Sequence, residues 1–314
     1  MRHKSKPEIS VVIPVYQAEN LVRPLLDQLT KELQSITDHY EIILVEDRSP
    51  DNSWQELKKA TVLFPCLTVL RLSRNFGQHY AISAGLARAT GEWIVVMDCD
   101  LQDQPSEISQ LYEEAKKGFD IVLARRAVRQ DSWMKRVSSN LFYRALGYLT
   151  GTDQDSSVAN FGIYNNKVIT AINMMPESIR YFPTMVRWVG FKSTKLDVVH
   201  SARPEGKTSY NLKKLLDLSL DICLANSDKP IRLTIKLGLS VAFTGFIFAA
   251  YVAARALLGE IQVIGYASLL VSIWILSGFI ICITGVVGLY VGKAFEGIKN
   301  RPLYIIDEII ENEE

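Results

Sequence analysis

Apolar and polar positions follow two alternating patterns along the first 125 residues. Short runs that are apolar throughout indicate strands buried on both faces of a sheet. The stretches between them repeat apolar residues every three or four positions, as amphipathic helices do. Strands that alternate with helices predict an α/β fold with a mostly parallel sheet. Strands are expected at residues 9–15, 40–45, 67–72, 93–97 and 120–124, and helices at 19–35 and 105–117, with others beginning near Trp54 and Gly77.

Two long apolar stretches occupy the C-terminal part of the chain. Residues 237–254 and 261–292 carry no charged side chain, and each is long enough to cross a bilayer as a helix. Basic residues precede the first stretch and follow the second, whereas the turn near Gly259 is not basic, which predicts two spans with both termini in the cytoplasm. A buried helical hairpin in a soluble protein is the alternative. The expected parts are residues 1–229, a membrane part 230–296 with spans at about 233–257 and 264–291, and a cytoplasmic tail 297–314.

Two further stretches, 133–149 and 210–224, combine basic side chains with leucine and aromatic residues at helical spacing. Helices of this kind can lie in a membrane interface with the apolar face in the lipid. The alternative is an ordinary helix half buried in a protein core. We favour the interfacial interpretation because two expected spans accompany these stretches.

Composition narrows the classes of function. The net charge of +1 and the lack of a basic tail argue against a general nucleic-acid binder. The four cysteines show no Cys-x-x-Cys spacing, which fits scattered reduced thiols. No Gly-x-Gly-x-x-Gly motif follows the first expected strand, so a dinucleotide-binding protein is disfavoured.

The strand expected at 93–97 ends in two acids, Asp98 and Asp100. On a continuing strand, residues two apart share a face, and open α/β sheets bind ligands at the carboxyl ends of their strands. Carboxylate oxygens suit Mg²⁺ or Mn²⁺, which can bridge a nucleotide diphosphate. The alternative is an acidic loop that caps the helix starting at Pro105. Asp47, after the second strand, is expected to converge on the same crevice.

Three sequence blocks lie in order along the chain: Ile13-Pro14-Val15-Tyr16, Val45-Glu46-Asp47-Arg48-Ser49 and Asp98-Cys99-Asp100-Leu101-Gln102. Together they resemble the family 2 glycosyltransferases, which have a GT-A fold. A later block, residues 203–210, and the two apolar stretches are similar to the polyprenyl-phosphate glycosyltransferases. That group includes bactoprenol glucosyltransferases and dolichol-phosphate mannose synthases, and the resemblance covers nearly the whole chain.

The resemblance implies a role for each matching residue. The residues expected to line the nucleotide are Pro14, Tyr16, Glu19, Asp47 and Asp98. The expected ligands of Mg²⁺ or Mn²⁺ are Asp98, Asp100 and Gln102. The acceptor phosphate is expected to contact Arg126, Arg136, Ser139, Arg203 and Lys207. The expected catalytic residues are Asp98, Asp100 and Arg126.

The resemblance also implies a reaction. One sugar would move, with inversion, from a nucleotide-sugar, with UDP-glucose favoured, to polyprenyl (undecaprenyl) phosphate at the cytoplasmic face of the inner membrane. The expected partners are this donor, the lipid acceptor and membrane lipids, without nucleic acid, and the spans would allow a homo-oligomer. Two alternatives remain, a processive polysaccharide synthase and a non-catalytic, membrane-anchored nucleotide-binding scaffold.

Overall fold

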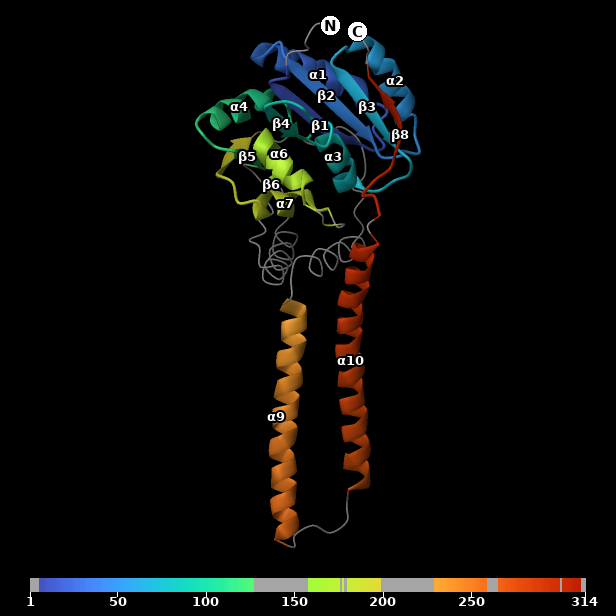
Figure 1. The fold of residues 1–314 in the computed structure, drawn as a ribbon, viewed down its shortest axis with the longest axis vertical. Coiled ribbons are helices and arrows are strands. Elements are labelled where there is room, and N and C mark those ends of the chain that lie inside the picture. Colours follow the sequence, from blue (N-terminus) through green and yellow to red (C-terminus); the bar gives the residue numbers. More distant parts are fainter. Residues whose placement is uncertain are drawn as a thin grey trace. The chain divides into compact units, whose positions relative to one another are not determined.

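The structure, a computed structural model, describes residues 6–126, 158–175, 177, 180–198, 229–258, 265–299 and 301–311. The chain divides into two compact units. One consists of Met1–Tyr143, Gln154–Ser209 and Arg301–Glu314, and the other of Arg144–Asp153 and Tyr210–Asn300. The first contains the sheet and the second contains two long helices (Figure 1). The helices expected at 133–149 and 210–224 lie outside the described residues.

Within the described residues, one sheet of eight strands has the order β7-β5-β6-β4-β1-β2-β3-β8. β6 and β8 run antiparallel to their neighbours, and all other neighbouring pairs are parallel. The predicted α/β fold with a mostly parallel sheet is therefore confirmed. The strands are β1 (Ile9–Val15), β2 (Tyr40–Glu46), β3 (Leu67–Leu72), β4 (Trp93–Val96), β5 (Ile121–Arg126), β6 (Val158–Asn165), β7 (Ser193–Val198) and β8 (Ile306–Ile310).

Helices cover both faces of this sheet (Figure 1). Each face carries its own cluster of buried apolar side chains. Gly85 shows how closely one helix approaches the sheet, because a Cβ at this position would lie 2.4 Å from Val12 Cγ1. This contact explains the small residues that the sequence places in this helix. The helices of this unit are α1 (Val22–Ile36), α2 (Ser53–Leu63), α3 (Gln78–Leu86), the short 3₁₀ helix η1 (Pro105–Glu107), α4 (Ile108–Lys116), α6 (Asn166–Asn173) and α7 (Phe182–Trp188).

The C-terminal strand β8 was not among the strands expected from the sequence, which assigned residues 297–314 only to a tail. β8 pairs antiparallel with the outer edge of β3 and becomes the last strand on that side of the sheet. The chain therefore contributes a segment from each of its ends to the same sheet. Figure 1 shows β8, in red, beside β3.

The second unit contains the helices α9 (Lys229–Leu257) and α10 (Tyr266–Ile298). They lie next to each other, since a Cβ at Gly238 would be 3.5 Å from Ile283 Cδ1. By length and composition, Ile231–Phe248 of α9 could cross a membrane, whereas the apolar segment found in α10, Leu276–Gly292, is shorter. Within the described residues, α9 thus provides one candidate span, and the second span stays a prediction.

Candidate active site

Three strained backbone positions follow the carboxyl ends of β1, β2 and β4. Gln17, Arg48 and Leu101 have φ values of 52°, 53° and 56°, and in the described part of the chain they are the non-glycine residues with positive φ. This left-handed region is uncommon for side chains other than Asn, Asp and His. Backbone strain of this kind clusters at functional sites, where the surrounding structure holds it in place. The carboxyl edge of the sheet is therefore the candidate site, as the sequence predicted.

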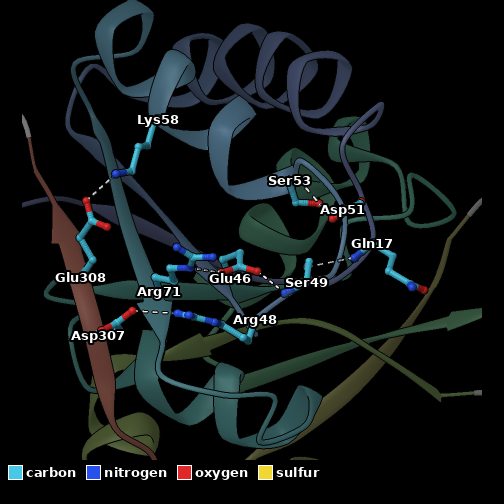
Figure 2. A network of polar contacts seen from close by, with 10 residues as sticks. All are labelled: Gln17, Glu46, Arg48, Ser49, Asp51, Ser53, Lys58, Arg71, Asp307 and Glu308. Carbon is cyan, nitrogen blue, oxygen red and sulfur yellow. Dashed lines mark hydrogen bonds and ion pairs between the residues drawn. The ribbon is translucent and has the colours of Figure 1, made fainter.

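Side chains join the loop after β1 to the loop after β2. The hydroxyls of Ser49 and Ser53 accept hydrogen bonds from the backbone N–H of Gln17 (3.1 Å) and Ala18 (3.0 Å). Figure 2 shows the Gln17–Ser49 contact together with Asp51 and Ser53. Because these bonds link residues more than thirty positions apart, each loop sets the shape of the other.

Glu19 takes part in the same contact between the two loops. Its backbone N–H donates to Asp51 Oδ2 (3.3 Å), and its own carboxylate accepts from the backbone N–H of Asn52 (3.0 Å). The carboxylate expected to line the nucleotide therefore has a structural task in holding the loops together. Tyr16, which precedes Gln17 in the same loop, has an exposed side chain at 44%. Pro14 lies within β1, opposite Val45 of β2.

Asp47 is buried at the start of the loop after β2, with 3% of its surface exposed. Its two oxygens accept hydrogen bonds from the backbone N–H of Phe76 (2.7 Å) and Gly77 (2.8 Å). Burial raises the pKa of Asp47 above its ordinary value, while these two hydrogen bonds act in the opposite direction. The carboxylate thus fixes the segment that leads into α3, a role that spacing alone did not indicate.

Gln78, the first residue of α3, connects that segment to the acidic motif, which consists of residues 98–102. Its side-chain Nε2 donates to Asp98 Oδ1 over 2.7 Å. No local sequence pattern indicates a role for Gln78, because this residue lies 20 positions from Asp98 in the chain. Asp47 and Asp98 are thereby linked through residues 76–78, and the crevice that they were expected to share stays a prediction.

The acidic motif itself lies on a turn. β4 ends at Val96, so Asp98 and Asp100 do not share the face of a continuing strand, and that expectation was wrong. The turn instead includes the left-handed Leu101, and Asp100 Oδ1 accepts from the backbone N–H of Gln102 (3.1 Å). Both carboxylates are partly buried.

The alternative, in which the acids cap the next helix, receives no support. The residue before η1 is Gln104, and it makes no side-chain capping bond. Between the acids, burial raises the pKa of Cys99 to about 12. The thiol therefore stays protonated near neutral pH when no cation is bound.

The site offers oxygen ligands to a cation. Asp98, Asp100 and the amide of Gln102 are hard donors of the kind that Mg²⁺ and Mn²⁺ prefer. Within the described residues, no three or more His, Cys, Asp or Glu side chains gather as a complete metal cage. The donor set fits a cation that completes its coordination with ligand oxygens and water.

The predicted acceptor residues are mostly beyond what the structure describes. Arg126 is the last residue of β5 and pairs in register with Val198 of β7. β5 is separated from β4 by β6 alone in the strand order. The other predicted acceptor residues, Arg136, Ser139, Arg203 and Lys207, lie outside the described residues.

Comparisons with known proteins show the family of the chain. The family described as "Glycosyl transferase family 2" matches residues 10–170. A "Prophage bactoprenol glucosyl transferase homolog" of Escherichia coli (strain K12) is 33% identical over 304 residues, covering 96% of this chain and 99% of that protein. An "Undecaprenyl-phosphate 4-deoxy-4-formamido-L-arabinose transferase" of Serratia proteamaculans (strain 568) is 32% identical over 306 residues, covering 96% of this chain and 94% of that protein.

A solved structure shares the fold. Glucosyl-3-phosphoglycerate synthase from Mycobacterium tuberculosis, in complex with Mn²⁺, UDP and phosphoglyceric acid, has a TM-score of 0.52 and 16% sequence identity. The likeness covers 70% of this chain and 77% of that one. At this identity the likeness concerns the fold, and it agrees with the GT-A fold expected from the sequence.

Proposed function

Because the chain belongs to glycosyl transferase family 2, we propose that it transfers one sugar from a nucleotide-sugar to polyprenyl phosphate at a membrane. One observation carries this proposal: Asp98 and Asp100 lie at the carboxyl edge of the sheet in a chain that also contains the apolar helix α9. Relatives that resemble the chain over 96% of its length are named for bactoprenol and undecaprenyl phosphate. The donor we favour is UDP-glucose, and the lipid is undecaprenyl phosphate.

A divalent cation, Mg²⁺ or Mn²⁺, would be held by Asp98, Asp100 and Gln102. When bound, it would offset the negative charge of the leaving diphosphate. Gln78 holds one oxygen of Asp98 through a 2.7 Å hydrogen bond, which would fix the orientation of this carboxylate. The residues that would line the nucleotide are Pro14, Tyr16, Glu19 and Asp47. Glu19 and Asp47 would also hold the loops around the nucleotide in shape.

The acceptor phosphate is an anion near neutral pH, so its attack needs no strong general base. An oxygen of that phosphate forms a bond to the anomeric carbon while the bond from this carbon to the nucleotide diphosphate breaks, with inversion at the carbon. The difficulty is to bring two polyanions together, and positive side chains lower that cost by binding phosphate oxygens. Arg126, Arg136, Ser139, Arg203 and Lys207 are the residues we assign to this task.

The helices supply the second half of the proposal. α9 and α10 would form two membrane spans, with both termini and the sheet on the cytoplasmic side, where a polyprenol keeps its phosphate at the interface. Residues 1–229 would then be the catalytic part, 230–296 the membrane part and 297–314 a cytoplasmic tail that includes β8. The interfacial helices at 133–149 and 210–224 would support the sheet at the membrane surface, and the spans would allow a homo-oligomer.

The direct test uses membranes that contain the full chain, undecaprenyl phosphate, Mn²⁺ or Mg²⁺, and a panel of labelled UDP- and GDP-sugars. UDP-4-deoxy-4-formamido-L-arabinose belongs in the panel because several relatives are named for that sugar. We expect chelator-sensitive transfer of label into the organic phase from one donor. Label that remains aqueous with every donor would contradict the lipid acceptor.

Replacement of one metal ligand sharpens this test. Asp100→Asn should lower transfer at least about 100-fold, since a neutral amide binds a cation far more weakly than a carboxylate. Asp27→Asn is the matched control, because Asp27 is exposed on α1 and pairs with Arg23 there. Both variants should reach the membrane fraction in wild-type amounts. Full activity in Asp100→Asn would remove this residue from the site.

A further inference from the structure

The edge strand β8 contains a bulge at Asp307. Arg71 of β3 pairs with Glu308, but the next residue, Leu72, pairs with Ile306, so Asp307 is the extra residue on β8. A bulge of this kind turns the strand and re-aims the side chain at the extra position. Asp307 therefore lies outside the regular alternation of side chains along β8.

The packing on either side of the bulge agrees with this register. Ile310 packs against the cluster that includes residues of α1 and α2, whereas Ile306 packs against the cluster that includes residues of α3. In an uninterrupted strand, residues four apart would lie on the same face. The extra residue moves Ile306 and Ile310 to opposite faces, and Asp307 lies at the point of change.

From this position Asp307 reaches the loop after β2. Its Oδ2 accepts from Arg48 Nη1 over 2.8 Å, as Figure 2 shows. Arg48 follows Asp47 directly and is one of the residues with positive φ. An arginine in this conformation is strained, so a contact that holds its side chain also favours the backbone shape that it requires.

The loop after β2, which contains Arg48, lies at the proposed donor site. Ser49, next to Arg48, donates its backbone N–H to a carboxylate oxygen of Glu46 and accepts from the backbone N–H of Gln17. Glu46 in turn accepts from Arg71 Nε over 3.2 Å. Figure 2 shows this path from β8 through Arg48 and Ser49 to Gln17, a second strained residue.

We propose that Asp307 is a positioning residue for nucleotide-diphosphate binding: by holding Arg48, it stabilises the loop after β2 in the shape that receives the donor. The inference rests on the proposed function, since the donor site is assigned there. The chain segment that leaves α10 thus ends in a strand that adjusts the donor site.

β8 provides its own control. Glu308, the neighbouring acid, pairs with Lys58 Nζ over 2.7 Å, and Lys58 lies in α2, away from the strained loop. The acids are similarly exposed, with 49% of the Asp307 side chain and 41% of the Glu308 side chain accessible. Asp307→Ala and Glu308→Ala therefore remove comparable charges and comparable ion pairs. They differ in the element that loses its contact with β8, which is the loop after β2 for Asp307 and the helix α2 for Glu308.

The experiment measures binding of UDP and of GDP, each with Mn²⁺, to the full chain in detergent by calorimetry, followed by donor KM and kcat for transfer. For the nucleotide that binds, Asp307→Ala should raise Kd and donor KM about threefold, the size that an exposed ion pair allows, with kcat unchanged. Glu308→Ala should leave all three values unchanged. The difference between the two variants should disappear in 1 M salt, where exposed charges are screened.

A double variant identifies the partner of Asp307. In the Arg48→Ala background, Asp307→Ala should have no further effect on nucleotide Kd, because the contact is already absent. Equal Kd values for Asp307→Ala and Glu308→Ala, or effects that add in the double variant, would overturn this inference. Wild-type protein that binds neither nucleotide would overturn the proposed function as well, so the two failures are distinguishable.

Discussion

The sheet unit and the helices α9 and α10 use the same apolar residue types in opposite ways. Phe161 in β6 is 0% exposed, whereas Phe246 in α9 and Ile281 in α10 are 74% and 72% exposed. Among the described residues, no buried core side chain comes from α9 or α10. Exposed apolar surface on this scale marks an interaction site for a membrane or a protein. One chain therefore has surfaces suited to two different surroundings, which supports the proposed membrane spans.

Two matched substitutions, one in the sheet unit and one in α9, test this difference in exposure. Of the changes predicted below, the first should alter the free energy of unfolding most. Phe161→Ala should lower the free energy of unfolding of the sheet unit by about 3–5 kcal/mol, because it removes a buried ring and leaves a cavity. Phe246→Ala removes the same atoms from an exposed position on α9. It should leave the unfolding of the sheet unit almost unchanged, as followed by thermal denaturation of the full chain in detergent. Equal losses in both variants would contradict the division into two kinds of surface.

The interior of the sheet unit can also be probed by pH. Nδ1 of His79 is buried and has no hydrogen-bond partner in the described part of the structure, and the ring contacts Tyr181 edge-on. Burial lowers the pKa of His79 from 6.5 to about 4. The folded state therefore binds fewer protons than the unfolded state between these pH values, so stability falls as the pH falls from 6.5 to 4 and changes no further below 4.

His79→Gln should remove this contribution, which is on the order of 3 kcal/mol over the whole range. The measurement is the slope of unfolding free energy against pH, so a uniform loss of stability in the variant does not disturb it. His39→Gln is the control, because His39 is exposed. An unchanged slope in His79→Gln would show that this imidazole is accessible to water.

The smallest of these effects concerns the polar edge of the same unit. Gln78→Leu removes the hydrogen bond to Asp98 and keeps a side chain of similar size, so affinity for Mn²⁺ and kcat should each fall about tenfold, as expected for a hydrogen bond to a charged group. Gln55→Leu, an exposed position on α2, should change neither value. Titration with Mn²⁺ measures the first quantity without turnover, and unchanged affinity would show that Gln78 does not position Asp98.

Local patterns were enough to predict much of the sheet unit. The apolar runs match β1, β2 and β3 almost to the residue, because strands buried on both faces leave an unmistakable run of apolar side chains. The acids Asp98 and Asp100 were also found from sequence, since an apolar strand that ends in carboxylates is a local signal. The turn on which they lie was not, because a turn of this kind depends on a strained residue, Leu101, that no propensity indicates.

Distant contacts decided the rest. β8 exists because the outer edge of β3 offers unpaired backbone groups, and nothing within residues 306–310 reveals that partner. Gln78 reaches Asp98, and Asp307 reaches Arg48, across separations of 20 and 259 positions. The sequence by itself determined the strands β1 to β5, which long segments are apolar and where the acids lie. The tertiary structure alone decided which side chains hold those acids and loops in place, because such contacts form only after the strands have assembled into one sheet.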